Sequence, residues 1–129
     1  MNSRSKGRRG EREVIEVIKT LTDIQLEVNY SQTYGGGHDL LGAEPYAIEV
    51  KRRKAITQGD VRQWWVQTWE QAGKVNLTPC LWYRADRQQW QVVIPHISNH
   101  YPVDDFNCTA IITPELWSKL YKEHKDGSQ

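Results

Sequence analysis

Two acids and a lysine, Asp39, Glu49 and Lys51, lie close enough in the sequence to form one chemical site. Glu49 and Lys51 are two residues apart in a stretch with the pattern of a strand, so their side chains share a face. Ile48 and Val50 point the other way, and both are apolar. Asp39 lies on the preceding short strand, which pairs back as a hairpin and can bring its carboxylate close to Glu49.

This arrangement suits the binding of a hydrated divalent cation. Two carboxylates and a backbone carbonyl, here that of Val50, form an oxygen site of the kind that Mg²⁺ prefers, with Mn²⁺ as the alternative. Such an ion makes a coordinated water easier to deprotonate and neutralises charge on a phosphate. Lys51 would orient or activate that water, because partial desolvation lowers the pKa of an amine. Taken alone, an acid two residues from a lysine on a strand is more often a surface ion pair. The apolar residues on the opposite face of this strand favour a metal-binding site instead.

Cations are concentrated in two short stretches. Residues 1–12 and 51–54 hold nine of the 17 Lys and Arg residues, although the net charge of the chain is only +1. This distribution predicts a surface that faces a polyanion, with a solvated basic tail as the alternative for the first stretch. No base-reading motif is evident, so we expect contacts to the DNA backbone and a strong dependence on salt. The predicted phosphate contacts are Arg4, Lys6, Arg8, Arg9, Arg52, Arg53 and Lys54.

The turn ahead of Asp39 offers two further candidate DNA contacts. The run Gly35–Gly37 has no Walker lysine, which argues against a nucleotide cofactor, and it allows a DNA backbone to approach closely. Tyr34 is a candidate contact at this loop. His38 could bind the phosphate, move a proton or ligate a metal, although a locally hydrogen-bonded loop histidine is the commoner case.

The elements that must position these residues alternate between helical and extended patterns. The order predicts an α/β fold: a small mixed β-sheet flanked by helices, in a single domain over residues 10–129 after a basic flexible segment over 1–9. Thr57 and Asp60 form a capping box that opens the second helix. The expected helices are 10–21, 58–73 and 114–124, and the expected strands are 24–30, 39–42, 46–51, 80–84, 90–94 and 108–113.

Several classes of protein are disfavoured by composition. No apolar run reaches the length of a membrane span, and the basic N-terminus lacks the apolar segment of a signal peptide. Two cysteines, Cys80 and Cys108, do not make a disulfide framework, so we expect a cytoplasmic protein without membrane contact.

Six Trp residues are a high number for one core of this size. Three of them, Trp64, Trp65 and Trp69, lie on the second helix and cannot all face the same side. Two are expected in the core, and the remainder at a homodimer interface or stacked on unpaired bases. We favour the dimer interface.

Asp39 is followed about ten residues later by Ile48-Glu49-Val50-Lys51. This pattern resembles the PD-(D/E)xK nuclease signature, with His38 in place of the usual proline. Lys6-Gly7 and Glu11-Arg12-Glu13 resemble the opening of archaeal-type Holliday junction resolvases, so that the likeness covers residues 6–73. It implies a restriction-endonuclease-like core. It also makes Glu11 a third metal-binding acid, with Glu13 as the alternative, and adds a supporting glutamine, Gln63 or Gln67.

The resemblance implies a structure-selective endonuclease that makes paired nicks in branched DNA. A homodimer would place two active sites about a two-fold axis that matches a four-way junction. One alternative is a general, restriction-type or repair-type nuclease that acts on ordinary DNA. The other is a nucleic-acid-binding module that keeps the fold without chemistry, although the intact acid, acid and lysine argue against it.

Overall fold

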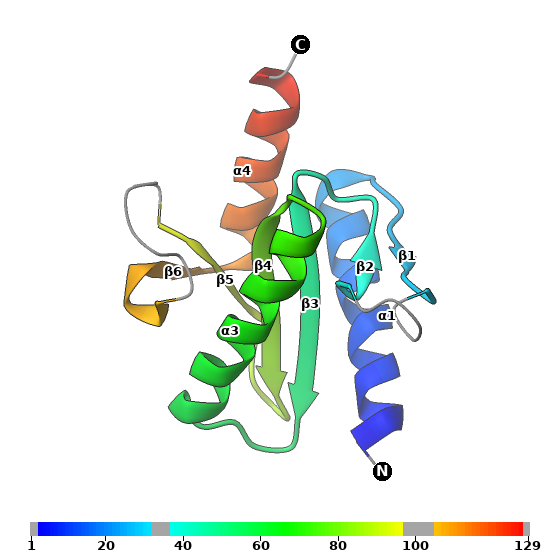
Figure 1. Cartoon of the computed structure of the whole chain (residues 1–129). Coiled ribbons are helices and arrows are strands. Elements are labelled where there is room, and N and C mark those ends of the chain that lie inside the picture. Colours follow the sequence, from blue (N-terminus) through cyan, green and yellow to red (C-terminus); the bar gives the residue numbers. More distant parts are fainter. Residues whose placement is uncertain (1–2, 32–36, 97–104, 128–129) are drawn as a thin grey trace.

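The computed structural model describes residues 3–31, 37–96 and 105–127, with side chains from Gly7 onward. It shows a six-stranded sheet with helices on both faces, which confirms the predicted α/β fold (Figure 1). The sheet order follows the chain order from β1 to β6. The elements are α1 (Ser3–Thr22), β1 (Glu27–Val28), β2 (Leu40–Leu41), β3 (Tyr46–Arg53), α3 (Gln58–Lys74), β4 (Thr78–Ala85), β5 (Gln91–Pro95), η1 (Phe106–Cys108), β6 (Thr109–Ile112) and α4 (Pro114–Gly127).

The sheet is mixed because one connection crosses over. Strands β1, β2 and β3 pair antiparallel, β3 and β4 pair parallel, and β4, β5 and β6 are again antiparallel. Helix α3 makes the crossover between the two parallel strands, as such a connection requires. Its start is fixed by the predicted capping box, in which Thr57 and Asp60 each accept the other's backbone N–H.

Helices α1 and α4 cover one face of the sheet and α3 covers the other (Figure 1), and a separate hydrophobic core lies between the sheet and the helices on each face. Ile48 and Val50 of β3 pack with α1 and α4 in the larger core. Leu81, which is paired in register with Glu49, packs with Trp65 of α3 in the smaller core. The alternation of β3 therefore directs Glu49 and Lys51 to the α3 face.

The two cores also explain the high tryptophan content. Trp65 is buried in the smaller core, and Trp82, Trp90 and Trp117 are buried in the larger one. Because the sheet is covered on both faces, the buried tryptophans are divided between two cores. Trp64 is half-buried against the smaller core, with the Arg53 guanidinium 5.5 Å from its ring centroid.

Helix α1 begins at Ser3, earlier than the predicted start at Gly10. Arg8 and Arg9 are therefore exposed on the helix. Straight-chain cations are good helix formers, so the basic stretch does not oppose this extension. Strand β1 is shorter than predicted, since only Glu27–Val28 of the expected 24–30 is paired.

Gly10 sets how closely α1 approaches the sheet. A Cβ atom at this position would lie 3.0 Å from the Arg52 Cβ and 3.4 Å from Val50 Cγ1. The absence of a side chain thus allows α1 to pack directly on β3, and Glu11 follows as the next residue. Across the described ranges, no helix is both long and apolar enough to cross a membrane.

Candidate active site

The hairpin brings Asp39 onto the β3 backbone as predicted. Leu40 is paired with Ile48, and the Asp39 N–H donates to the Ile48 carbonyl over 2.9 Å. The Asp39 carboxylate Oδ2 accepts the Val50 N–H at 2.8 Å. The carboxylate is thereby held beside Glu49, the residue between these two partners.

Glu49 is buried on this face, with 8% of its surface exposed. Burial raises its pKa to about 9, and the charge of Asp39 and a hydrogen bond with that side chain act in the same direction. The charge of Lys51 lowers the pKa of Glu49, which places the half-buried lysine near the pair. Two acids and a lysine thus meet on one face of the sheet, and one acid holds its proton at neutral pH.

Helix α1 adds Glu11 to this group. Burial raises the pKa of Glu11 to about 7, and the charge of Asp39 is the second cause of this rise. The charges of Arg12 and Arg8 lower the pKa. Glu11 in turn raises the pKa of Glu49. The structure therefore brings Glu11 within electrostatic reach of both other acids.

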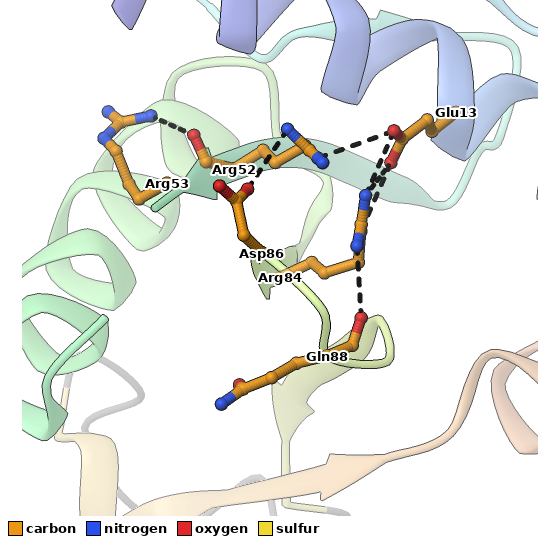
Figure 2. Close-up of polar contacts among 6 residues, drawn as sticks. All are labelled: Glu13, Arg52, Arg53, Arg84, Asp86 and Gln88. Atoms are coloured by element: carbon orange, nitrogen blue, oxygen red, sulfur yellow. Dashed lines mark hydrogen bonds and ion pairs between the residues drawn. The ribbon is translucent and has the colours of Figure 1, made fainter. Parts of the chain in front are cut away.

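Glu13 has a different set of partners (Figure 2). Its carboxylate accepts two hydrogen bonds of 3.1 Å and one of 3.3 Å from Arg84, and lies 3.5 Å from Arg52 Nε. Arg52 also lies 3.4 Å from Asp86. The ion-pair network of Glu13, Arg52, Arg84 and Asp86 joins α1 to β3 and β4. Of the two predicted alternatives, the geometry thus favours Glu11 for the site.

The donor set fits a cation that keeps much of its hydration shell. Within the described part of the chain, no three His, Cys, Asp or Glu side chains are grouped closely enough to bind a metal by themselves. Asp39 and Glu49 nevertheless lie close together, and both burial and the charge of Asp39 raise the pKa of Glu49. Mg²⁺ is bound in this way, by one or two carboxylates and several waters.

Arg52 was predicted as a phosphate contact, and the structure contradicts this. Its side chain is 11% exposed and lies in the ion-pair network, on the face opposite Glu49. The reason is the strand period, since Arg52 shares its face with Val50. Arg53 and Lys54 follow at the end of β3, where Arg53 is half-buried and Lys54 is exposed.

His38 is 4% exposed and does not fit the predicted DNA contact. The Asn29 side-chain amide donates to its carbonyl at 2.9 Å, and burial lowers the pKa of its ring. The ring Nδ1 is buried and has no hydrogen-bond partner among the described residues, so the local contact of His38 is made by its backbone and not by its ring. Tyr34 and the side chains of Arg4 and Lys6 lie outside the described residues.

A glutamine that the sequence did not single out supports the site. Gln71 Oε1 accepts the Gly37 N–H at 2.6 Å, two residues before Asp39. Gln63 and Gln67, the predicted candidates, are exposed on α3. All three are spaced by four residues and share one side of the helix. The spacing was visible in the sequence, but the choice depended on which turn of α3 lies beside the loop.

We expect Gln71→Met to reduce cleavage about tenfold or more, because loss of the acceptor frees the segment that carries Asp39. Gln71→Glu retains an acceptor oxygen and is expected to keep most of the activity. The measurement is the Mg²⁺ dependence of the single-turnover rate for both variants, with Gln67→Met as the control. If Gln71→Glu is as impaired as Gln71→Met, the side-chain NH₂ carries the function instead.

The comparisons with known proteins agree with this geometry. The chain is 27% identical to Protein D14 of Escherichia phage T5, and the match covers 73% of this chain and 71% of that protein. No solved structure matches the chain significantly. The family profile described as "Phage putative PDDEXK endonuclease" matches residues 2–126. The chain, with its acids and lysine gathered on one strand pair, therefore belongs to this PDDEXK endonuclease family.

Proposed function

We propose that the chain is a Mg²⁺-dependent DNA endonuclease that hydrolyses phosphodiester bonds, with Mn²⁺ as an alternative metal. The observation that carries the proposal is the carboxyl pair, Asp39 and Glu49, with Lys51 on the same face and Glu11 within electrostatic reach. Asp39, Glu49 and the Val50 carbonyl would hold the metal. The family supports nuclease chemistry in general terms.

Each residue has a task in this mechanism. The Val50 N–H fixes one oxygen of the Asp39 carboxylate, which orients the group that would hold the metal. Lys51 orients or activates the attacking water, and Glu11 positions that water or completes the metal site. A bound divalent cation acidifies water and neutralises negative charge on the phosphate. In-line attack would then break the bond to the leaving oxygen.

For the substrate we propose branched DNA, in particular a four-way junction, cut by a homodimer. Support comes from the resemblance of Lys6-Gly7 and Glu11-Arg12 to junction resolvases. Exposed cations without a base-reading motif also favour recognition of the backbone and shape. Two sites related by a two-fold axis would match the symmetry of the junction. Linear duplex DNA is the rival substrate.

The test is a cleavage assay on two labelled DNAs of the same sequence, a four-way junction and a linear duplex. We expect symmetric paired nicks in the junction alone when Mg²⁺ is present. In EDTA we expect no nicks in either DNA. Equal cutting of both DNAs would retain the nuclease and reject the junction preference. Binding without cutting, in either Mg²⁺ or Mn²⁺, would reject the nuclease itself and favour the binding module.

A further inference from the structure

An arginine and a tryptophan stack on each other beside the candidate active site. The guanidinium carbon of Arg53, on β3, lies 5.5 Å from the centroid of the Trp64 ring, on α3. Both residues are half-buried. We propose that Trp64 is a positioning residue, which holds Arg53 ready to bind a phosphate of the DNA strand near the cleaved bond. This inference rests on the proposed function.

Strand β3 itself joins the stacked pair to the catalytic residues. Its pairing with β4 continues without interruption to Arg53, so Glu49, Lys51 and Arg53 share one face of the strand. The contact with Trp64 agrees with this, because Trp64 packs against the core on the α3 face. The Cα atoms of Lys51 and Arg53 are about 7 Å apart along the strand. Phosphates of one DNA strand follow each other at about 3.4 Å along the duplex axis, so a phosphate on Arg53 would lie within a few nucleotides of the cleaved bond.

Helix α3 places the same pair beside the active-site loop. Trp64 and Gln71 are seven residues apart, so they lie on one flank of α3, about 10 Å from each other along its axis. Gln71 accepts the Gly37 N–H at one end of this flank, and Trp64 contacts Arg53 at the other. Figure 1 shows α3 running back along the sheet from the end of β3. The two contacts therefore lie on either side of the catalytic part of β3.

The stacking leaves the charge of Arg53 available to a ligand. Arg53 Nη1 donates to the Arg52 carbonyl at 3.0 Å, which uses one of the five N–H donors of the guanidinium. Among the described residues no acid lies within ion-pair distance of Arg53, whereas Arg52 and Arg84 both pair with Glu13. Figure 2 shows the Arg53 side chain extending away from that network. The indole ring of Trp64 has no acceptor, so the other donors remain for a phosphate.

The ring of Trp64 reduces the cost of ordering this arginine. A long side chain at the end of a strand loses rotamer freedom when it binds a ligand, and this loss weakens binding. Attraction between the guanidinium and the face of an indole ring restricts the side chain before DNA arrives. Trp64 thereby acts through Arg53. This differs from both roles that the sequence left open for it, a dimer contact and stacking on an unpaired base.

The test measures affinity for the labelled four-way junction and the linear duplex in EDTA, over a range of salt concentrations. We expect Arg53→Gln to weaken binding about tenfold and to lower the salt slope by about 0.9. Trp64→Leu should weaken binding about threefold with the salt slope unchanged, and Trp64→Phe, which keeps an aromatic face, less than about twofold. The double variant Arg53→Gln, Trp64→Leu should bind as Arg53→Gln does, because Trp64 has no arginine left to position.

Arg62→Gln is the matched control. The Arg62 guanidinium lies 5.1 Å from the centroid of the Phe106 ring, so this arginine is also stacked on an aromatic ring. It is two residues before Trp64, and residues so spaced on a helix point to different sides. We expect Arg62→Gln to bind with wild-type affinity. If Trp64→Leu is unfolded by circular dichroism, Arg53→Lys takes its place, since lysine keeps the charge but lacks the planar group that stacks.

Three results would overturn the inference while wild-type cleavage keeps the proposed function. The first is wild-type affinity in Arg53→Gln, or in both Trp64→Leu and Arg53→Lys. The second is a full sum of the two losses in the double variant, which would mean that Trp64 contacts DNA itself. The third is a Trp64→Leu protein that changes its oligomeric state on gel filtration and loses affinity for that reason. If wild type neither binds nor cuts either DNA, the proposed function fails and this inference with it.

Discussion

Replacing Asp39 by Asn is expected to abolish DNA cleavage while the fold and DNA binding persist. The Asn amide oxygen can still accept the Val50 N–H, so the hairpin contact of 2.8 Å is retained. The carboxylate charge that would hold the metal is lost. Metal catalysis supplies several kcal/mol, so we expect a single-turnover rate reduced by about 1,000-fold or more. Binding is expected to be equal or tighter, because a negative charge near the phosphate is removed.

The matched control is Asp23→Asn. Asp23 is exposed at the end of α1 with a positive φ of 65°, a conformation that asparagine adopts as readily. This variant should cut at the wild-type rate. Cleavage by Asp39→Asn above about a tenth of that rate would reject the assigned site. So would metal-independent cleavage by the wild type.

The second large effect is on stability. The metal-free protein is expected to lose stability as the pH rises from about 4.5 toward 9. Glu49 has a pKa of about 9 in the folded state and an ordinary value of 4.5. Between these values the folded state holds a proton that the unfolded chain releases, so rising pH favours unfolding. One such group contributes a slope of up to about 1.4 kcal/mol per pH unit.

Mg²⁺ should oppose this loss, because it binds the deprotonated carboxylates of the folded state only. We expect the added stability to grow with pH. Urea unfolding with and without Mg²⁺, above pH 7, is the measurement. The measurement is made above pH 7 because His38 has a lowered pKa in the folded state. Below its ordinary value of 6.5, His38 therefore makes stability rise with pH, opposite to Glu49.

Glu49→Gln separates stability from activity. Glutamine has the shape of the protonated acid, so the variant is expected to be more stable than wild type above pH 7 and to have a flatter pH dependence. It should also lose cleavage and the stabilisation by Mg²⁺. An unchanged pH slope in this variant would show that Glu49 is not the titrating group.

The sequence by itself determined the chemistry of the central strand. The period of a strand places Glu49 with Lys51 and apart from Val50, and this depends only on neighbouring residues. The capping box at Thr57 and the order of helices and strands follow from equally short patterns. The hairpin that delivers Asp39 is also local, since its two strands are nearly adjacent in the chain.

The tertiary structure decided everything that depends on where α1 and α3 pack. Glu11 and Glu13 are two residues apart on α1, and the packing of that helix brings Glu11 within electrostatic reach of the carboxyl pair while Glu13 pairs with Arg84. The pairing of Arg52 with Glu13 depends on the same packing, and so does the contact of Gln71 with Gly37, which Gln63 and Gln67 do not make. Such contacts join residues far apart in the chain, and local periodicity carries no information about them.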